Sequence, residues 1–161
     1  NCWFRGPSAR LVGSNKNSSI GVNTRHTMES LVSRIDTLIA VECVPWHRDG
    51  YTVRVELKKR GRTQVVHFER IEDRYVFRSV VLPPRHVTAT DKEWRRLAYL
   101  TWCRNATKDL VAFAFDAANA LIGVIEVPAA TLDREELQMY VETLAKECDR
   151  FEYALTGEDT R

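Results

Sequence analysis

The feature that most constrains this fold is a meander of three strand-like segments joined by short turns. Residues 51–57 alternate between apolar and polar side chains, the pattern of a strand with one buried face. Two further segments, 63–69 and 75–82, are rich in β-branched and aromatic residues. The links at 59–62 and 71–74 are too short for a crossover connection. The three strands are therefore predicted to pair antiparallel.

Three amphipathic helices are predicted around this meander. The first spans about 28–40 and has Thr27 as its N-cap, because apolar residues recur there at helical spacing. The second follows Thr90, which forms a capping-box pattern with Glu93. The third is expected to begin after Thr131 and to end near Gly157.

Two more strands, 111–115 and 121–127, lie between the second and third helices. The predicted order is α-β-β-β-α-β-β-α. The fold class is α+β, with a five-stranded antiparallel sheet packed with helices, because each element buries one apolar face.

The chain of 161 residues is the length of one domain. Residues 1–26 contain several glycines, a proline and a polar run at 14–19, without sustained periodicity. We expect a flexible leader there, not all of it native, followed by one domain over 27–161.

No metal, cofactor or catalytic site is indicated. The four cysteines form no Cys-x-x-Cys pair, and no histidine has a second ligand at helical spacing. Nucleophile elbows, phosphate loops and dinucleotide fingerprints are absent from the sequence. The prediction is a protein that is not an enzyme. An enzyme of unrecognised type is the alternative that a closed pocket with convergent carboxylates or paired histidines would support.

The charge and hydropathy of the chain indicate where the protein resides and which classes of partner it can bind. The net charge of +2 is too small to indicate nucleic acid or a membrane, and no apolar run is long enough to span a bilayer. The cysteine usage favours a reducing cytoplasm. Residues 54–104 hold thirteen Lys or Arg against six Asp or Glu, about +7. That excess is typical of a solvated face, or of a surface for an acidic partner, while nucleic acid is unlikely.

The second helix is apolar more than halfway round. Its main apolar stripe contains Trp94, Leu97, Ala98, Thr101 and Trp102. Tyr99 and Leu100 lie off that stripe. Such a helix either is deeply buried or packs on two sides, with its own sheet on one side and a second subunit or peptide on the other.

The sequence resembles the type III secretion chaperones and the related YbjN-like proteins over about residues 28–155. The resemblance is carried by two stretches. One comprises 61–68 and 78–82, and the other runs from Trp102 through 111–113 and 121–128 to the last helix. The slightly basic charge and the polar leader favour the YbjN-like branch, with its regulatory or peptide-holding roles.

The resemblance implies a non-enzymatic chaperone or adaptor, commonly a homodimer, that holds extended segments of a partner polypeptide and needs no cofactor. A regulatory module that senses a small molecule or nucleotide is the alternative, motivated by the basic middle of the chain. The residues predicted for the peptide-binding or dimer surface are Trp94, Tyr99, Leu100, Trp102, Arg62, Phe68 and Arg78.

Overall fold

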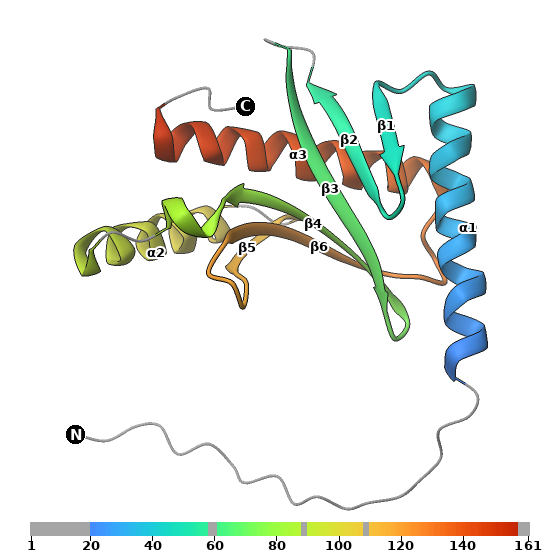
Figure 1. The fold of residues 1–161 in the computed structure, drawn as a ribbon, viewed down its shortest axis with the longest axis horizontal. Coiled ribbons are helices and arrows are strands. Elements are labelled where there is room, and N and C mark those ends of the chain that lie inside the picture. The colour runs from blue at the N-terminus through green and yellow to red at the C-terminus, as the bar shows by residue number, and fades with distance from the viewer. Residues whose placement is uncertain (1–19, 58–60, 88–89, 108–109, 158–161) are drawn as a thin grey trace, which may run out of the picture.

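The computed structural model describes residues 20–57, 61–87, 90–107 and 110–157, with the side chains of 20–27 left aside. The fold consists of one antiparallel sheet of six strands and three α-helices that pack against it (Figure 1). The helices are α1 (Ile20–Val41), α2 (Asp91–Asn105) and α3 (Arg134–Thr156), with a short 3-10 turn at Pro84–His86. The strands are β1 (Trp46–Asp49), β2 (Thr52–Leu57), β3 (Arg62–Ile71), β4 (Arg74–Leu82), β5 (Ala112–Phe115) and β6 (Leu121–Pro128).

The strands lie in the order β1-β2-β3-β4-β6-β5, so β1 and β5 are the two edges. Opposing residues such as Phe68 and Phe77, and Phe77 and Ile125, share one buried face. The other face exposes polar residues, including His67 and Arg78. This alternation is what a sheet covered on one side requires.

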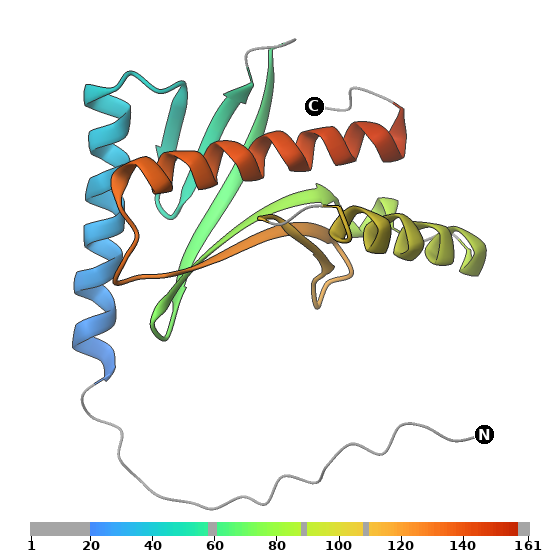
Figure 2. The ribbon, with the colours of Figure 1, turned by 180° about the vertical axis from the view of Figure 1, so that it is seen from behind.

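α3 covers the buried face and crosses the strands, as Figure 2 shows from behind. Asp133 begins this helix with a capping box, because its side chain accepts a hydrogen bond from Glu136 N while the Glu136 side chain accepts one from Asp133 N. Gly157 ends it at φ 67°, in the left-handed conformation that favours glycine. The helix is amphipathic as predicted, and five residues of its apolar face are buried: Leu137, Val141, Leu144, Cys148 and Phe151.

α1 and α2 lie at opposite ends of the sheet (Figure 1). α1 lies beside β1 and buries a stripe formed by Met28, Leu31, Ile35 and Leu38. α2 packs against the short edge strand β5, where the rings of Trp94 and Phe115 have centroids 4.4 Å apart. Because β5 is only four residues long, α2 buries few side chains.

The α+β fold class and the antiparallel sheet are confirmed, and three details need correction. The sheet has six strands, because the unpredicted β1 pairs with β2. α1 begins at Ile20, so Thr27 lies within the helix and is not its N-cap. The N-cap of α3 is Asp133 and not Thr131. Thr90 is confirmed as the N-cap of α2.

None of the helices in the described ranges has the length and apolar character needed to cross a membrane. Residues 1–19 of the predicted leader lie outside the described residues.

Candidate functional site

The two edges of the sheet differ in how their main-chain groups are satisfied. At the β5 edge, the side-chain amide of Asn105, the last residue of α2, forms two hydrogen bonds with Phe113. Its Oδ1 accepts from Phe113 N at 2.8 Å, and its Nδ2 donates to Phe113 O at 2.9 Å. The amide therefore takes the place that a neighbouring strand would occupy at Phe113, and α2 packs against the same edge.

The β1 edge is arranged differently. Glu56 N donates to Pro45 O, so the hydrogen-bonded pairs between β1 and β2 continue at His47 with Arg54. Because such pairs alternate in antiparallel strands, the main chains of Trp46 and Arg48 face away from β2. Trp46 N already donates to Val44 O at 2.8 Å, so Arg48 is the residue whose main chain points in the direction from which an added strand would pair.

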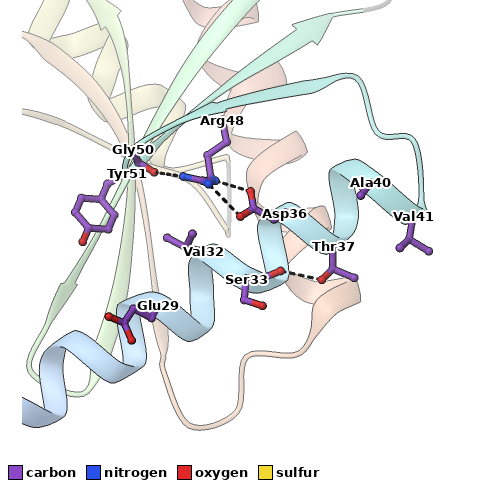
Figure 3. Close-up of a pocket in the computed structure, with 10 residues that line it drawn as sticks. All are labelled: Glu29, Val32, Ser33, Asp36, Thr37, Ala40, Val41, Arg48, Gly50 and Tyr51. Atoms are coloured by element: carbon purple, nitrogen blue, oxygen red, sulfur yellow. Dashed lines mark hydrogen bonds and ion pairs between the residues drawn. The ribbon is translucent and has the colours of Figure 1, made fainter.

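A groove runs beside this edge, between α1 and the β1–β2 turn (Figure 3). We call it the α1 groove; it has a volume of about 830 Å³. Its helix wall presents mostly small or polar side chains, which leave room for a second backbone, and its other wall includes the exposed ring of Tyr51. The residues lining it are Glu29, Val32, Ser33, Asp36, Thr37, Ala40, Val41, Arg48, Gly50 and Tyr51.

An ion pair sets the spacing of the two walls. Arg48 of β1 donates to both carboxylate oxygens of Asp36 in α1, at 2.5 Å from Nε and 3.0 Å from Nη2, and also to Gly50 O at 3.0 Å (Figure 3). The hydrogen bond with Asp36 raises the pKa of Arg48 above its usual value. The bidentate geometry fixes the orientation of the two elements as well as their distance.

α2 carries the most exposed aromatic surface among the described residues. The side chains of Tyr99 and Trp102 are 61% and 66% exposed, and their ring centroids are 6.1 Å apart. The sequence pattern placed Trp102 on the same stripe as Leu97 and Thr101, which are buried, but Trp102 is exposed because α2 rests on a strand too short to cover it. A hydrogen bond with Cys103 raises the pKa of Tyr99. Trp94 and Leu100 are partly buried against the core beneath these rings.

The remaining predicted site residues are not brought together with the α2 surface. Phe68 is 3% exposed and belongs to the core, so it offers no surface. Arg62 lies under α3, where it pairs with Asp149 and stacks over the Tyr153 ring at 5.9 Å. Arg78 lies on the open face and pairs with Glu69 at 2.7 Å.

A second hollow, of about 680 Å³, lies between α3 and the ends of β1, β2 and β3. Its charged lining residues include Arg62, Asp149 and Lys146, each of which already has a partner within the chain. Within the described part of the chain, no group of three His, Cys, Asp or Glu is placed to hold a metal ion.

Sequence reasoning overlooked Asp36, Arg48 and Asn105. Each of them acts on the neighbouring element of the chain, and the pairing of a helix side chain with a strand leaves no periodic pattern in the sequence. The one available signal was the position of Asn105 at the end of a helix that leads directly into a strand.

No protein-family model matches the chain, and no curated protein matches it either. Among solved structures, it is similar to the HopA1–SchA chaperone–effector complex, with a TM-score of 0.50, 8% identity, and coverage of 83% of this chain and 98% of that chain. It also matches the ExsC–ExsE complex (TM-score 0.48, 15% identity, 86% and 97% covered). A third match is the Yersinia pestis type III secretion chaperone SycH with a fragment of YscM2 (TM-score 0.46, 14% identity, 72% and 94% covered).

Proposed function

We propose that this chain, which has the fold of the type III secretion chaperones, is a non-enzymatic chaperone or adaptor that holds an extended segment of a partner polypeptide. The bound segment lies in the α1 groove and pairs with β1. The observation that carries the proposal is the contrast between the edges: the β5 edge is bonded by Asn105 at Phe113 and packed against α2, whereas the β1 edge faces a groove at Arg48. We place this activity in the cytoplasm.

Strand addition explains how such a groove binds many sequences. The main chain of Arg48, which lines the groove, supplies hydrogen bonds that do not depend on the partner's side chains. The groove follows α1 from Glu29 to Val41, about 18 Å, which accommodates five or six extended residues. Alternate side chains of the partner would then contact the helix wall, and this contact gives selectivity.

The comparison with solved structures supports a polypeptide as the ligand of this chain. The solved structure that shares the fold at a TM-score of 0.50 is of a chaperone bound to an effector. That complex makes a polypeptide the first class of ligand to test here. The YbjN-like branch of the resemblance remains a prediction.

The test is selection of peptides from a random display library by the full chain, with affinities measured by fluorescence anisotropy. Ala40→Arg places a long charged side chain on the exposed groove wall, and we expect it to weaken the selected peptides at least tenfold, about 1.4 kcal/mol. Ala154→Arg makes the same change on the exposed side of α3 and should leave affinity unchanged. Equal affinities for the two variants would contradict the groove as the site.

We also propose that the chain forms a homodimer through α2. Exposed aromatic side chains are favoured at interfaces because they bury large apolar areas with few rotatable bonds. Tyr99 and Trp102 form such a pair, and Arg95 and Arg96 are exposed on the same helix. Trp94 and Leu100 hold α2 against its own sheet and so present the pair outward.

Light scattering after size-exclusion chromatography tests the dimer. Tyr99→Ala with Trp102→Ala should convert the dimer to a monomer while the circular dichroism spectrum is retained, because both side chains lie outside the core. Met139→Ala removes a 47% exposed apolar side chain from α3 and serves as the control. A wild-type monomer, or a double variant that remains dimeric, would exclude α2 as the interface.

A further inference from the structure

We propose that a small hollow at the α2 end of the sheet binds an organic carboxylate with a short apolar chain, such as hexanoate. The hollow lies between the 3-10 turn, α2 and the last turn of α3, and its volume is about 210 Å³. α1 lies at the opposite end of the sheet, so this hollow is separate from the α1 groove (Figure 1). The inference therefore does not depend on the proposed function.

The floor of the hollow is apolar. Leu82 at the end of β4, Val87 after the 3-10 turn and Leu97 of α2 are buried and line it. Leu100 of α2 and Leu155 of α3 are half-buried and complete it. A hydrocarbon chain seated on this floor gains about fourfold in affinity for each methylene group that it buries.

The rim of the hollow carries more positive than negative charge. Arg85 and His86 of the 3-10 turn and Arg96 of α2 line it, and Glu93 is the one carboxylate among its described lining residues. Glu93 already accepts a hydrogen bond from Thr90 Oγ1 at 2.9 Å, within the cap of its own helix. Two guanidiniums therefore face one carboxylate that is engaged elsewhere.

The two arginines of the rim differ from other arginines in their partners. Elsewhere guanidiniums pair with carboxylates, as Arg104 does with Glu147 at 2.6 Å. Within the ranges that the structure describes, neither Arg85 nor Arg96 forms an ion pair. Arg85 instead donates from Nε to Nε2 of His86 at 3.3 Å, which uses one of its five N–H donors. The other donors are available to an anion.

The floor and the rim together select the chemistry of the ligand. A guanidinium fork matches the two oxygens of a carboxylate, and such charge-assisted hydrogen bonds are stronger than neutral ones. An inorganic anion would satisfy the rim but leave the apolar floor uncovered. The volume is below the roughly 300–1,000 Å³ of sites for drug-sized ligands, which favours a short chain.

Titration of the isotope-labelled full chain with hexanoate, followed by NMR, tests the site. Saturable amide shifts should gather at Arg85, Val87, Leu97 and Leu155. Acetate should bind at least tenfold more weakly because it leaves the floor bare, and hexanol at least tenfold more weakly because it carries no charge. Equal affinities for hexanoate and acetate would show only general attraction of anions to a basic surface and would overturn the inference. Equal affinities for hexanoate and hexanol would overturn the assignment of a carboxylate.

A pair of substitutions tests the rim. Arg85→Gln with Arg96→Gln should weaken hexanoate at least tenfold, and the circular dichroism spectrum should be retained because both side chains are exposed. Arg95→Gln is the matched control, since Arg95 is an exposed neighbour on α2 that does not line the hollow, and its affinity should be unchanged. If the double variant binds as tightly as Arg95→Gln, the inference is wrong.

The same titration separates this site from the proposed function. Ala40→Arg obstructs the α1 groove and should leave hexanoate binding unchanged. The double variant of Arg85 and Arg96 should still bind the display-selected peptides. Hexanoate binding that is lost in Ala40→Arg would place the ligand in the α1 groove and overturn the assignment to the α2 end.

Discussion

Gly123 determines how closely α3 can approach the sheet. A Cβ at this position of β6 would lie 2.4 Å from Cys148 Sγ and 3.1 Å from a methyl group of Leu144, both in α3. A contact of 2.4 Å is one that real Cβ atoms essentially never show, so a side chain there must displace the Cys148 sulfur or the helix that bears it. The need for glycine here is a matter of space and not of backbone conformation, since Gly123 is not among the positive-φ glycines.

We expect Gly123→Ala to lower the free energy of unfolding by about 1–3 kcal/mol, the usual cost of overpacking a core. Cys148→Ala in the same chain removes the sulfur and should recover part of that loss, so the two changes should be non-additive. Urea denaturation of the wild type, both single variants and the double variant measures the coupling. Additive losses would show that Cys148 is not the obstacle.

At the scale of elements, the junction of α2 and β5 depends on one side chain. Asn105 satisfies both outward main-chain groups of Phe113, and the burial of Phe113 in the core depends on β5 keeping its place. The junction therefore connects the end of a helix to the edge of a sheet through two hydrogen bonds.

Asn105→Ala leaves a main-chain donor and acceptor without these bonds, and we expect a loss of about 1–3 kcal/mol in the free energy of unfolding. Asn105→Asp keeps the acceptor for Phe113 N but places a negative charge beside Phe113 O. Hydrogen exchange at Phe113 should be faster in Asn105→Ala than in Asn105→Asp. Unchanged exchange in both variants would contradict the role of the amide.

At the scale of the whole molecule, α3 is attached to the sheet by charge as well as by apolar packing. Arg62 of β3 and Asp149 of α3 form an ion pair with side-chain exposures of 17% and 13%. Arg104 of α2 pairs with Glu147 of α3 at 2.6 Å, so the same helix also contacts α2.

Asp149→Asn should lower the free energy of unfolding by about 2–4 kcal/mol, because it leaves the Arg62 guanidinium largely desolvated without its counter-charge. Glu126→Gln interrupts the pair with Arg74, where both side chains are more than half exposed, and should cost less than about 1 kcal/mol. Thermal or urea denaturation of the two variants provides the comparison. Equal losses would show that burial does not decide the strength of the Arg62–Asp149 pair.

Sequence patterns predicted the larger part of the fold because most of its elements carry a local signal. The alternation in 51–57 and the turn at Gly61 determine pairing between neighbours in the chain. β1 was missed because only Trp46 of its four residues is buried, so its alternation is too short to recognise.

The candidate site was predicted less well, because it depends on how a helix packs beside the strand that follows it. Asp36 and Arg48 can form their ion pair only because α1 packs beside β1. Tyr99 and Trp102 were recognised as surface candidates from composition, but the structure separates them from Arg62, Phe68 and Arg78. A sequence can indicate which residue types suit an interface without indicating which of them share a face.

The unequal edges of the sheet bear on polymerisation. A fibre built by edge-to-edge pairing needs two accepting edges on every copy, one for the copy before and one for the copy after. With Phe113 occupied by Asn105 and α2 packed against β5, a strand that paired with β1 as proposed would end the growth of the sheet. The proposed strand addition would then be limited to one added strand per copy.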